Sequence, residues 1–188
     1  MRKTALLTLA TLLFALPGVA AEVRPEVRAR AAGILDALNK IEAERNRPAA
    51  VPRSLTFTET EFNAYVVCRL DAESEPFVKA AEFKLLADDH IEGRITIDLG
   101  DRQTYGLLPK RQDLLFSARV ETRDGKIKVS MDKLFLGTQP IAPAVVDVII
   151  GILSRLQGVE PTSLEDWYDL PPGVLRLESR PGQIVVYY

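Results

Sequence analysis

Two hydrophobic periodicities divide the chain. Apolar residues recur at spacings of three and four in residues 23–46 and again in residues 59–70, which predicts two amphipathic helices. A short strand or lead-in is expected at residues 54–57. From residue 83 onward the spacing changes to two, so that apolar and polar residues alternate as they do on strands with one wet face. The expected order is helix, helix, four strands, helix and two strands.

The start of the second helix has the strongest local signal. Thr58 is placed to cap the helix through its hydroxyl, and Glu61 follows three residues later, where its carboxylate can reach back to the Thr58 amide. Phe57 and Phe62 flank this pair at the positions of a hydrophobic staple. The pattern therefore predicts a capping box at Thr58.

The strands are expected to pair as hairpins. Three hairpins join residues 83–87 to 91–99, 114–121 to 127–136, and 174–178 to 183–187. Their turns are at residues 88–90, at Asp124-Gly125, which is a strong hairpin signal, and at Pro181-Gly182. Gly93 is a candidate bulge. Consecutive hairpins predict an antiparallel sheet with one apolar face, and with the helices they indicate an α+β fold.

The third predicted helix, residues 142–156, is more apolar than one sheet face can cover. A surface helix needs an apolar stripe a little wider than ~100°, and here the polar strip is narrow. One interpretation is that the two N-terminal helices pack over it in a three-layer arrangement. The other is that an apolar groove remains between the sheet and the helix, where a lipid or acyl chain could bind.

Several short segments carry a family resemblance. Residues 55–65, LTFTETEFNAY, resemble the FTExELNAYL segment of exported bacterial proteins of unknown function. Residues 133–141 and 170–174 and the closing residues 182–186 are similar to other junctions of those proteins. The order of elements also resembles tubular (TULIP-like) lipid-binding domains. This resemblance implies a curved antiparallel sheet of about six strands wrapping a long apolar helix, with two N-terminal helices, and it suggests binding of a lipid or another hydrophobic ligand.

The N-terminus has the pattern of a secretory signal peptide. Arg2 and Lys3 precede an uncharged apolar run that is shorter than the ~20 residues needed to span a bilayer. Small residues then precede Glu22, so cleavage is expected between Ala21 and Glu22, leaving residues 22–188 as a single α+β domain. The predicted product is a periplasmic or extracellular protein without a transmembrane anchor.

The net charge and the cysteine content restrict the classes of partner that the protein is expected to bind. The 188 residues carry a net charge of -2, and loss of Arg2 and Lys3 makes the chain more acidic. This argues against nucleic acid as a partner, because nucleic acids favour basic surfaces. Cys68 is the single cysteine. It is interpreted as a small buried apolar residue, with an intermolecular disulfide as the alternative.

No catalytic or metal-binding pattern is present in the sequence. His90 is the single histidine, and its position beside a predicted turn favours a solvated loop residue over a catalytic base. Neighbouring acidic residues such as Asp88 and Asp89 are interpreted as solvated turn formers. No cysteine and histidine cluster, calcium loop or phosphate-binding loop occurs. We therefore expect a protein that is not an enzyme and has no metal or cofactor.

The sequence-based hypothesis is an exported protein that binds a lipid or other hydrophobic ligand without catalysis. The alternative is an envelope module that binds a protein partner through a sheet edge or an apolar patch. The expected groove lies between sheet and helix, and its predicted lining is Val145, Ile149, Ile152, Leu153, Leu156, Phe116, Ile95 and Met131.

Overall fold

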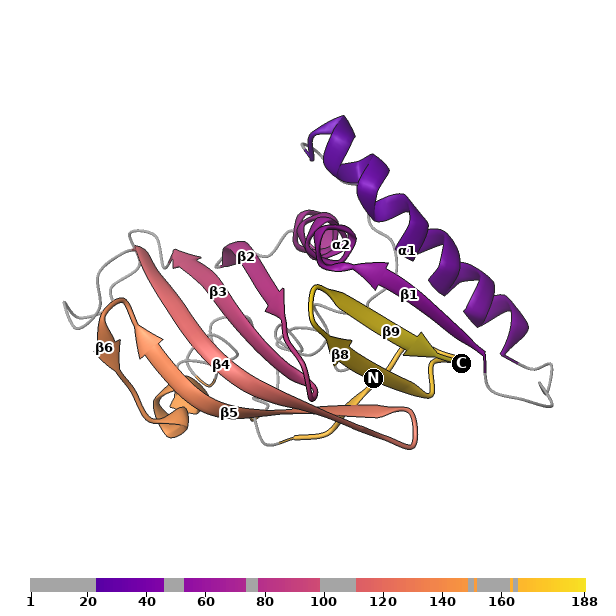
Figure 1. Ribbon diagram of the computed structural model, residues 1–188. Helices are drawn as coiled ribbons and strands as arrows, with labels where there is room; N and C mark the ends of the chain where they lie inside the picture. Colours follow the sequence, from indigo (N-terminus) through magenta and orange to yellow (C-terminus); the bar gives the residue numbers. More distant parts are fainter. Residues whose placement is uncertain are drawn as a thin grey trace.

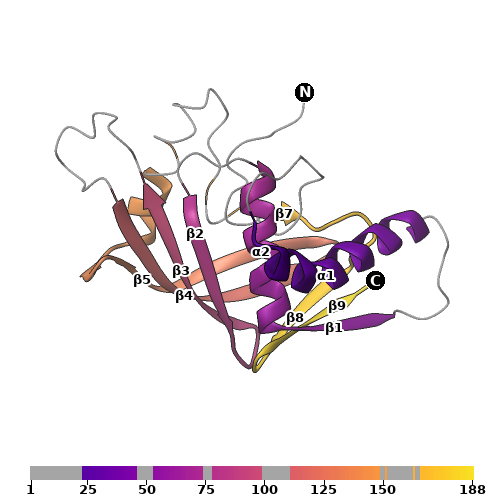
Figure 2. The ribbon, with the colours of Figure 1, turned by 90° about the horizontal axis from the view of Figure 1, so that it is seen from above.

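The fold is α+β, with antiparallel strands that curl into a half-barrel, as the strand pattern and the resemblance led us to expect (Figure 1 and Figure 2). The computed structural model describes residues 23–45, 53–73, 78–98, 111–148, 151, 163 and 166–188. The predicted signal peptide lies outside these residues. Within the described ranges, none of the helices has both the length and the hydropathy needed to traverse a bilayer.

The strands form two sheets where one was predicted. Sheet A has the order β1-β9-β8, built from β1 (Ser54–Thr58), β8 (Arg176–Arg180) and β9 (Gln183–Tyr187). Sheet B has the order β2-β3-β4-β5-β6, built from β2 (Val78–Leu85), β3 (His90–Asp98), β4 (Arg111–Arg123), β5 (Lys126–Leu136) and β6 (Gln139–Pro140), and β7 (Tyr168–Asp169) pairs with β5. The last hairpin pairs with β1, which lies more than a hundred residues earlier in the chain, and this pairing draws it away from sheet B.

The predicted hairpin turns are present. Asp124 and Gly125 have φ angles of 54° and 71°, which is the conformation that the Asp-Gly signal predicts for a two-residue turn. Asp88 and Asp89 take the same left-handed region, with φ angles of 57° and 59°, between β2 and β3. That region disfavours residues other than glycine, asparagine and aspartate, so a pair of aspartates is compatible with this turn.

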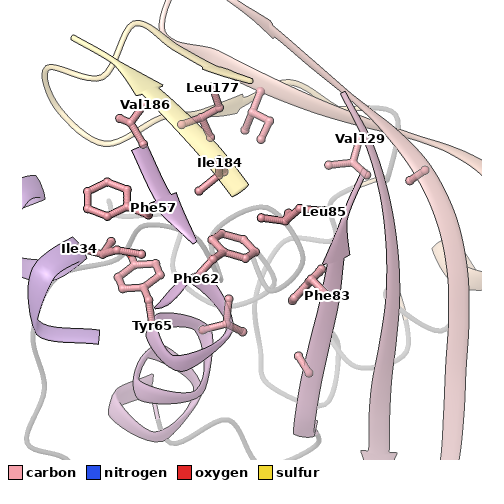
Figure 3. Close-up of a cluster of buried hydrophobic side chains, with 14 of the residues drawn as sticks. Ile34, Phe57, Phe62, Tyr65, Phe83, Leu85, Val129, Leu177, Ile184 and Val186 are labelled. Atoms are coloured by element: carbon pink, nitrogen blue, oxygen red, sulfur yellow. The ribbon is translucent and has the colours of Figure 1, made fainter. Parts of the chain in front are cut away.

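The helices are α1 (Pro25–Glu44) and α2 (Glu59–Glu73). One stripe of α1 is buried, formed by Ala31, Ile34, Ala37 and Ile41. In Figure 3 Ile34 lies beside Phe57 of β1 and Tyr65 of α2, so α1 covers the inner face of sheet A and the side of α2. Burial of this apolar stripe is the main term that holds a helix of this kind in place.

The capping box at the start of α2 is confirmed. The Thr58 amide donates a hydrogen bond to Glu61 Oε2 at 2.7 Å, and the Glu61 amide donates to Thr58 Oγ1 at 3.3 Å. These bonds stabilise the ionised carboxylate, and the backbone bond from Thr58 is the larger cause that lowers the pKa of Glu61.

Removing this carboxylate should destabilise the protein in a pH-dependent way. At neutral pH, Glu61→Ala is expected to lower the free energy of unfolding by about 0.5–1 kcal/mol, a value kept small by solvent screening. Because the pKa is lower in the folded state, this contribution is present above the ordinary glutamate pKa and is lost as the pH falls toward the folded-state value. Denaturant unfolding of both proteins at neutral and acidic pH measures the difference, and a difference that does not shrink in acid would contradict this assignment.

The third helix is described over residues 143–148 and at residue 151. Val146 is buried in the core, whereas Val145 and Val148 are 41% and 61% exposed. The predicted apolar helix over residues 142–156 is therefore seen only at its start. The described part of this helix places one side chain in the core. The residues that would show whether the rest of the helix fills the half-barrel lie outside the described part of the chain.

Candidate functional site

An apolar cavity of about 40 Å³ lies where sheet B, α2 and the β8–β9 hairpin meet. Figure 3 shows Phe62, Leu85 and Ile184 pointing toward this space from three different elements. Its described lining is eleven apolar side chains and one serine: Phe62, Val66, Phe83, Leu85, Ile91, Phe116, Val120, Ile127, Val129, Leu177, Ile184 and Ser179. A space lined in this way excludes charged ligands and suits an apolar group.

One cross-strand row sets the shape of the sheet B wall. In this row Phe83 of β2 is opposite Gly93 of β3, and Gly93 is opposite Phe116 of β4. The two phenylalanine rings pack edge to face with centroids 6.0 Å apart, and Phe62 of α2 adds a second such contact to Phe83 at 5.7 Å. Three aromatic rings therefore form one side of the cavity.

Gly93 is not a bulge, which corrects the sequence-based expectation. It is in regular register with both neighbouring strands, and the irregularity of β2 lies between Val78 and Ala80. A Cβ atom at Gly93 would overlap the outer end of the Phe116 ring. The glycine is required because the ring of Phe116 approaches the backbone here.

Ser179 closes the cavity at the seam between the two sheets. Its amide donates to Asp89 Oδ1 at 2.8 Å, and its hydroxyl lies 3.0 Å from the Leu86 carbonyl oxygen. The Asp89 carbonyl in turn accepts a bond from the Val120 amide at 2.8 Å. Asp89, which we interpreted as a solvated turn former, therefore links the β2–β3 turn to β4 and to β8.

The structure brings one of the predicted groove residues to the cavity. Phe116 lines it. Ile95 is buried in the core and Met131 is partly buried against it, but neither is among the lining residues. Ile95 is opposite Leu114, farther from the β2–β3 turn than the cavity, and Met131 is beside the irregularity of β4 and β5.

The other predicted groove residues are on the third helix. Val145 is exposed and does not line the cavity, because the inward position of the first helical turn is taken by Val146. Ile149, Ile152, Leu153 and Leu156 lie outside the described residues. The cavity therefore shares Phe116 with the predicted groove, and the groove between sheet and helix 142–156 stays a prediction.

The lining residues that the prediction missed come from α2 and from sheet A. Phe62 and Val66 belong to the predicted apolar face of α2, and Leu177 and Ile184 occupy the inward positions of the last hairpin. Each signal was visible in the periodicity. Periodicity does not show that residue 62 lies close to residue 184 in space, because that proximity depends on the pairing of β1 with β9.

The polar groups near the site have structural partners. His90 Nε2 lies 3.6 Å from Asp132 Oδ2 and 3.5 Å from a guanidinium nitrogen of Arg119, so this ring packs on the outer face of sheet B. It begins β3 and is half-buried, which differs from the solvated loop position that we predicted. The described residues contain no group of three or more histidine, cysteine, aspartate or glutamate side chains placed to hold a metal ion.

Cys68 is on α2, half-buried, and packs against the core. Burial is the largest cause that raises the pKa of its thiol, so at neutral pH this group is mainly protonated. This environment fits the interpretation of Cys68 as a small apolar residue.

The shape of the cavity thus depends on the packing of three aromatic rings, on Gly93, and on the hydrogen bonds of Ser179 at the seam between the two sheets. Comparison of this chain with protein-family models, with curated proteins and with solved structures finds no match.

Proposed function

We propose that this protein binds the apolar part of a lipid or another hydrophobic ligand on the concave face of the half-barrel, without catalysing a reaction. The observation that supports this proposal is the apolar cavity that α2 and both sheets surround. We also propose that the protein acts after export, on the basis of the signal-peptide pattern at residues 1–21.

The size of the cavity limits what can enter it. Its volume of about 40 Å³ is well below the roughly 150 Å³ that holds a benzene ring in an engineered apolar cavity. A ring system therefore does not fit. The end of an unbranched chain is narrow enough, and its remainder would continue over the apolar concave face toward solvent.

The cavity is also positioned to hold such a chain end tightly. Phe83 and Phe116 are 7% and 4% exposed, and Ile127 is 1% exposed. Burying the last methylene groups of a chain makes the free energy of binding more favourable by about 0.8 kcal/mol for each CH₂ group removed from water. The ligand polar group would remain outside, because the described lining offers Ser179 as its polar residue, and its amide and hydroxyl already have partners.

Filling the cavity should weaken binding. Val120 is half-buried and lines the cavity, so Val120→Trp is expected to occupy the space that a chain end would take and to weaken binding of a fluorescent fatty acid at least about tenfold. The matched control is Val67→Trp, because Val67 is 39% exposed on α2 and does not line the cavity.

Fluorescence titration of the two purified variants and the parent protein separates the outcomes. Equal affinity in all three would mean that the fatty acid binds elsewhere. No saturable binding to the parent protein would count against the proposed function itself.

A further inference from the structure

One face of β5 carries an apolar row along the concave side of sheet B and into the cavity. The row consists of the inward-facing residues Leu136, Leu134, Met131, Val129 and Ile127. The irregularity between β4 and β5 lies beside Met131 and moves the inward positions from even to odd numbers, so the row stays on one face. Its last two residues, Val129 and Ile127, line the cavity.

The two ends of this row differ in exposure. Met131 and Leu136 are half-buried, so accessible apolar surface remains on that part of the row. Ile127, at the other end, is 1% exposed. In the described part of the chain, Ile127 and Val66 are the largest side chains that are less than 2% exposed, and both line the cavity. The cavity is therefore the closed end of the row.

The backbone at Ile127 is held from both sides. Ile127 pairs with Thr122 of β4 and with Tyr168 of β7. Just after β7, the Leu170 amide donates to the Gly125 carbonyl at 2.8 Å, which fastens this segment to the β4–β5 turn. Because β5 has a partner strand on each side here, it cannot move aside to lengthen the cavity without losing ladder hydrogen bonds.

We propose that the ligand is an unbranched acyl chain that lies along this row with its methyl end against Ile127, and that Ile127 limits the length of chain that the cavity accepts. This inference rests on the proposed function and adds to it the direction of the chain and the residue that sets its limit. The cavity volume of about 40 Å³ leaves little spare room. A further CH₂ group at the closed end must therefore displace packed side chains, which is unfavourable.

Competition against a fluorescent fatty acid tests this limit with a homologous series of saturated, unbranched fatty acids. Until the chain reaches Ile127, each added CH₂ group should tighten binding roughly fourfold, the factor that corresponds to ~0.8 kcal/mol. Beyond that length, binding to the parent protein should level off or weaken.

Ile127→Ala should move the limit to longer chains. The substitution removes about three carbon atoms from the closed end, so affinity should continue to rise for about three further carbons. The longest of these chains should bind the variant at least about tenfold more tightly than it binds the parent protein. Ile127→Val removes a single carbon atom and is a milder change to the core, and it should move the limit by about one carbon.

Ile95→Ala is the matched control. Ile95 is 3% exposed on β3 of the same sheet, lies opposite Leu114, and does not line the cavity. Its substitution removes the same atoms from the core and should leave the chain-length limit unchanged.

The outcomes separate this inference from the proposed function. Saturable binding with the same limit in the parent protein and both Ile127 variants would overturn the inference alone, and so would a limit that moves equally in Ile95→Ala. A parent protein that binds none of the fatty acids saturably would overturn the proposed function and the inference with it.

Discussion

Gly93→Ala is expected to destabilise the protein by about 1–3 kcal/mol and to abolish most fatty-acid binding. The added Cβ atom would overlap Phe116, whose ring is 4% exposed and is held edge to face against Phe83. Because Phe116 lines the cavity, a displaced ring is expected to take up part of that space. Denaturant unfolding measures the cost in stability, and fluorescence titration measures the loss of binding.

Two further variants test whether the effect of Gly93→Ala comes from the overlap with Phe116. Gly33→Ala changes a glycine of α1 with no atom within 4 Å of the new Cβ, and it should stabilise the protein by roughly 0.5–1 kcal/mol. Combining Gly93→Ala with Phe116→Leu should restore part of the lost stability, because leucine leaves room for the new methyl group. If Gly93→Ala were as stable and as active in binding as the parent protein, the aromatic wall of the cavity would be wrongly assigned.

Asp89→Ala is expected to have the second large effect, a loss of about 1.5–3 kcal/mol in the free energy of unfolding. The substitution removes the acceptor of the Ser179 amide, and this serine is 5% exposed, so its donor would be left buried without a partner. Because this bond joins the two sheets, hydrogen exchange at Ser179 should accelerate more than exchange in the middle of sheet B.

Asp88→Ala is the control for this prediction. Asp88 is exposed and has nearly the same left-handed backbone conformation, with φ of 57° against 59° for Asp89. Both variants therefore carry the same cost of alanine in this conformation, and the difference between them isolates the seam. Equal destabilisation by the two substitutions would mean that the carboxylate of Asp89 does not hold the sheets together.

Local patterns in the chain predicted the elements well. The capping box at Thr58, the turn at Asp124-Gly125 and the strand that ends at Leu136 are all present. Each depends on residues that are close in sequence, such as a side chain that bonds an amide three residues away. The apolar positions of β4 and β5 were equally readable, since alternation follows from the geometry of a single strand.

The described cavity is a different space from the groove that the sequence predicted, which stays a prediction because most of its helix lies outside the described residues. The hypothesis placed a groove beside the third helix because that segment has the largest apolar excess, and of its proposed lining Phe116 reaches the cavity. Gly93 shows the difficulty: in sequence it indicated a bulge, and in the structure it makes room for the ring of Phe116 on the neighbouring strand. The identity of a close neighbour across a sheet is not contained in the local pattern.

The amino-acid sequence by itself determined the α+β class, the hairpins, and which face of each strand is apolar, because periodicity and turn chemistry act over a few residues. Only the tertiary structure decided that β1 joins the last hairpin in a separate sheet, that Asp89 bonds Ser179 across 90 residues of chain, and that α2 completes an apolar cavity. These contacts depend on which distant segments of the chain pack together and exclude water. Burial of apolar area alone favours many alternative pairings of segments about equally, and the native pairing is selected by complementary shape and by hydrogen bonding.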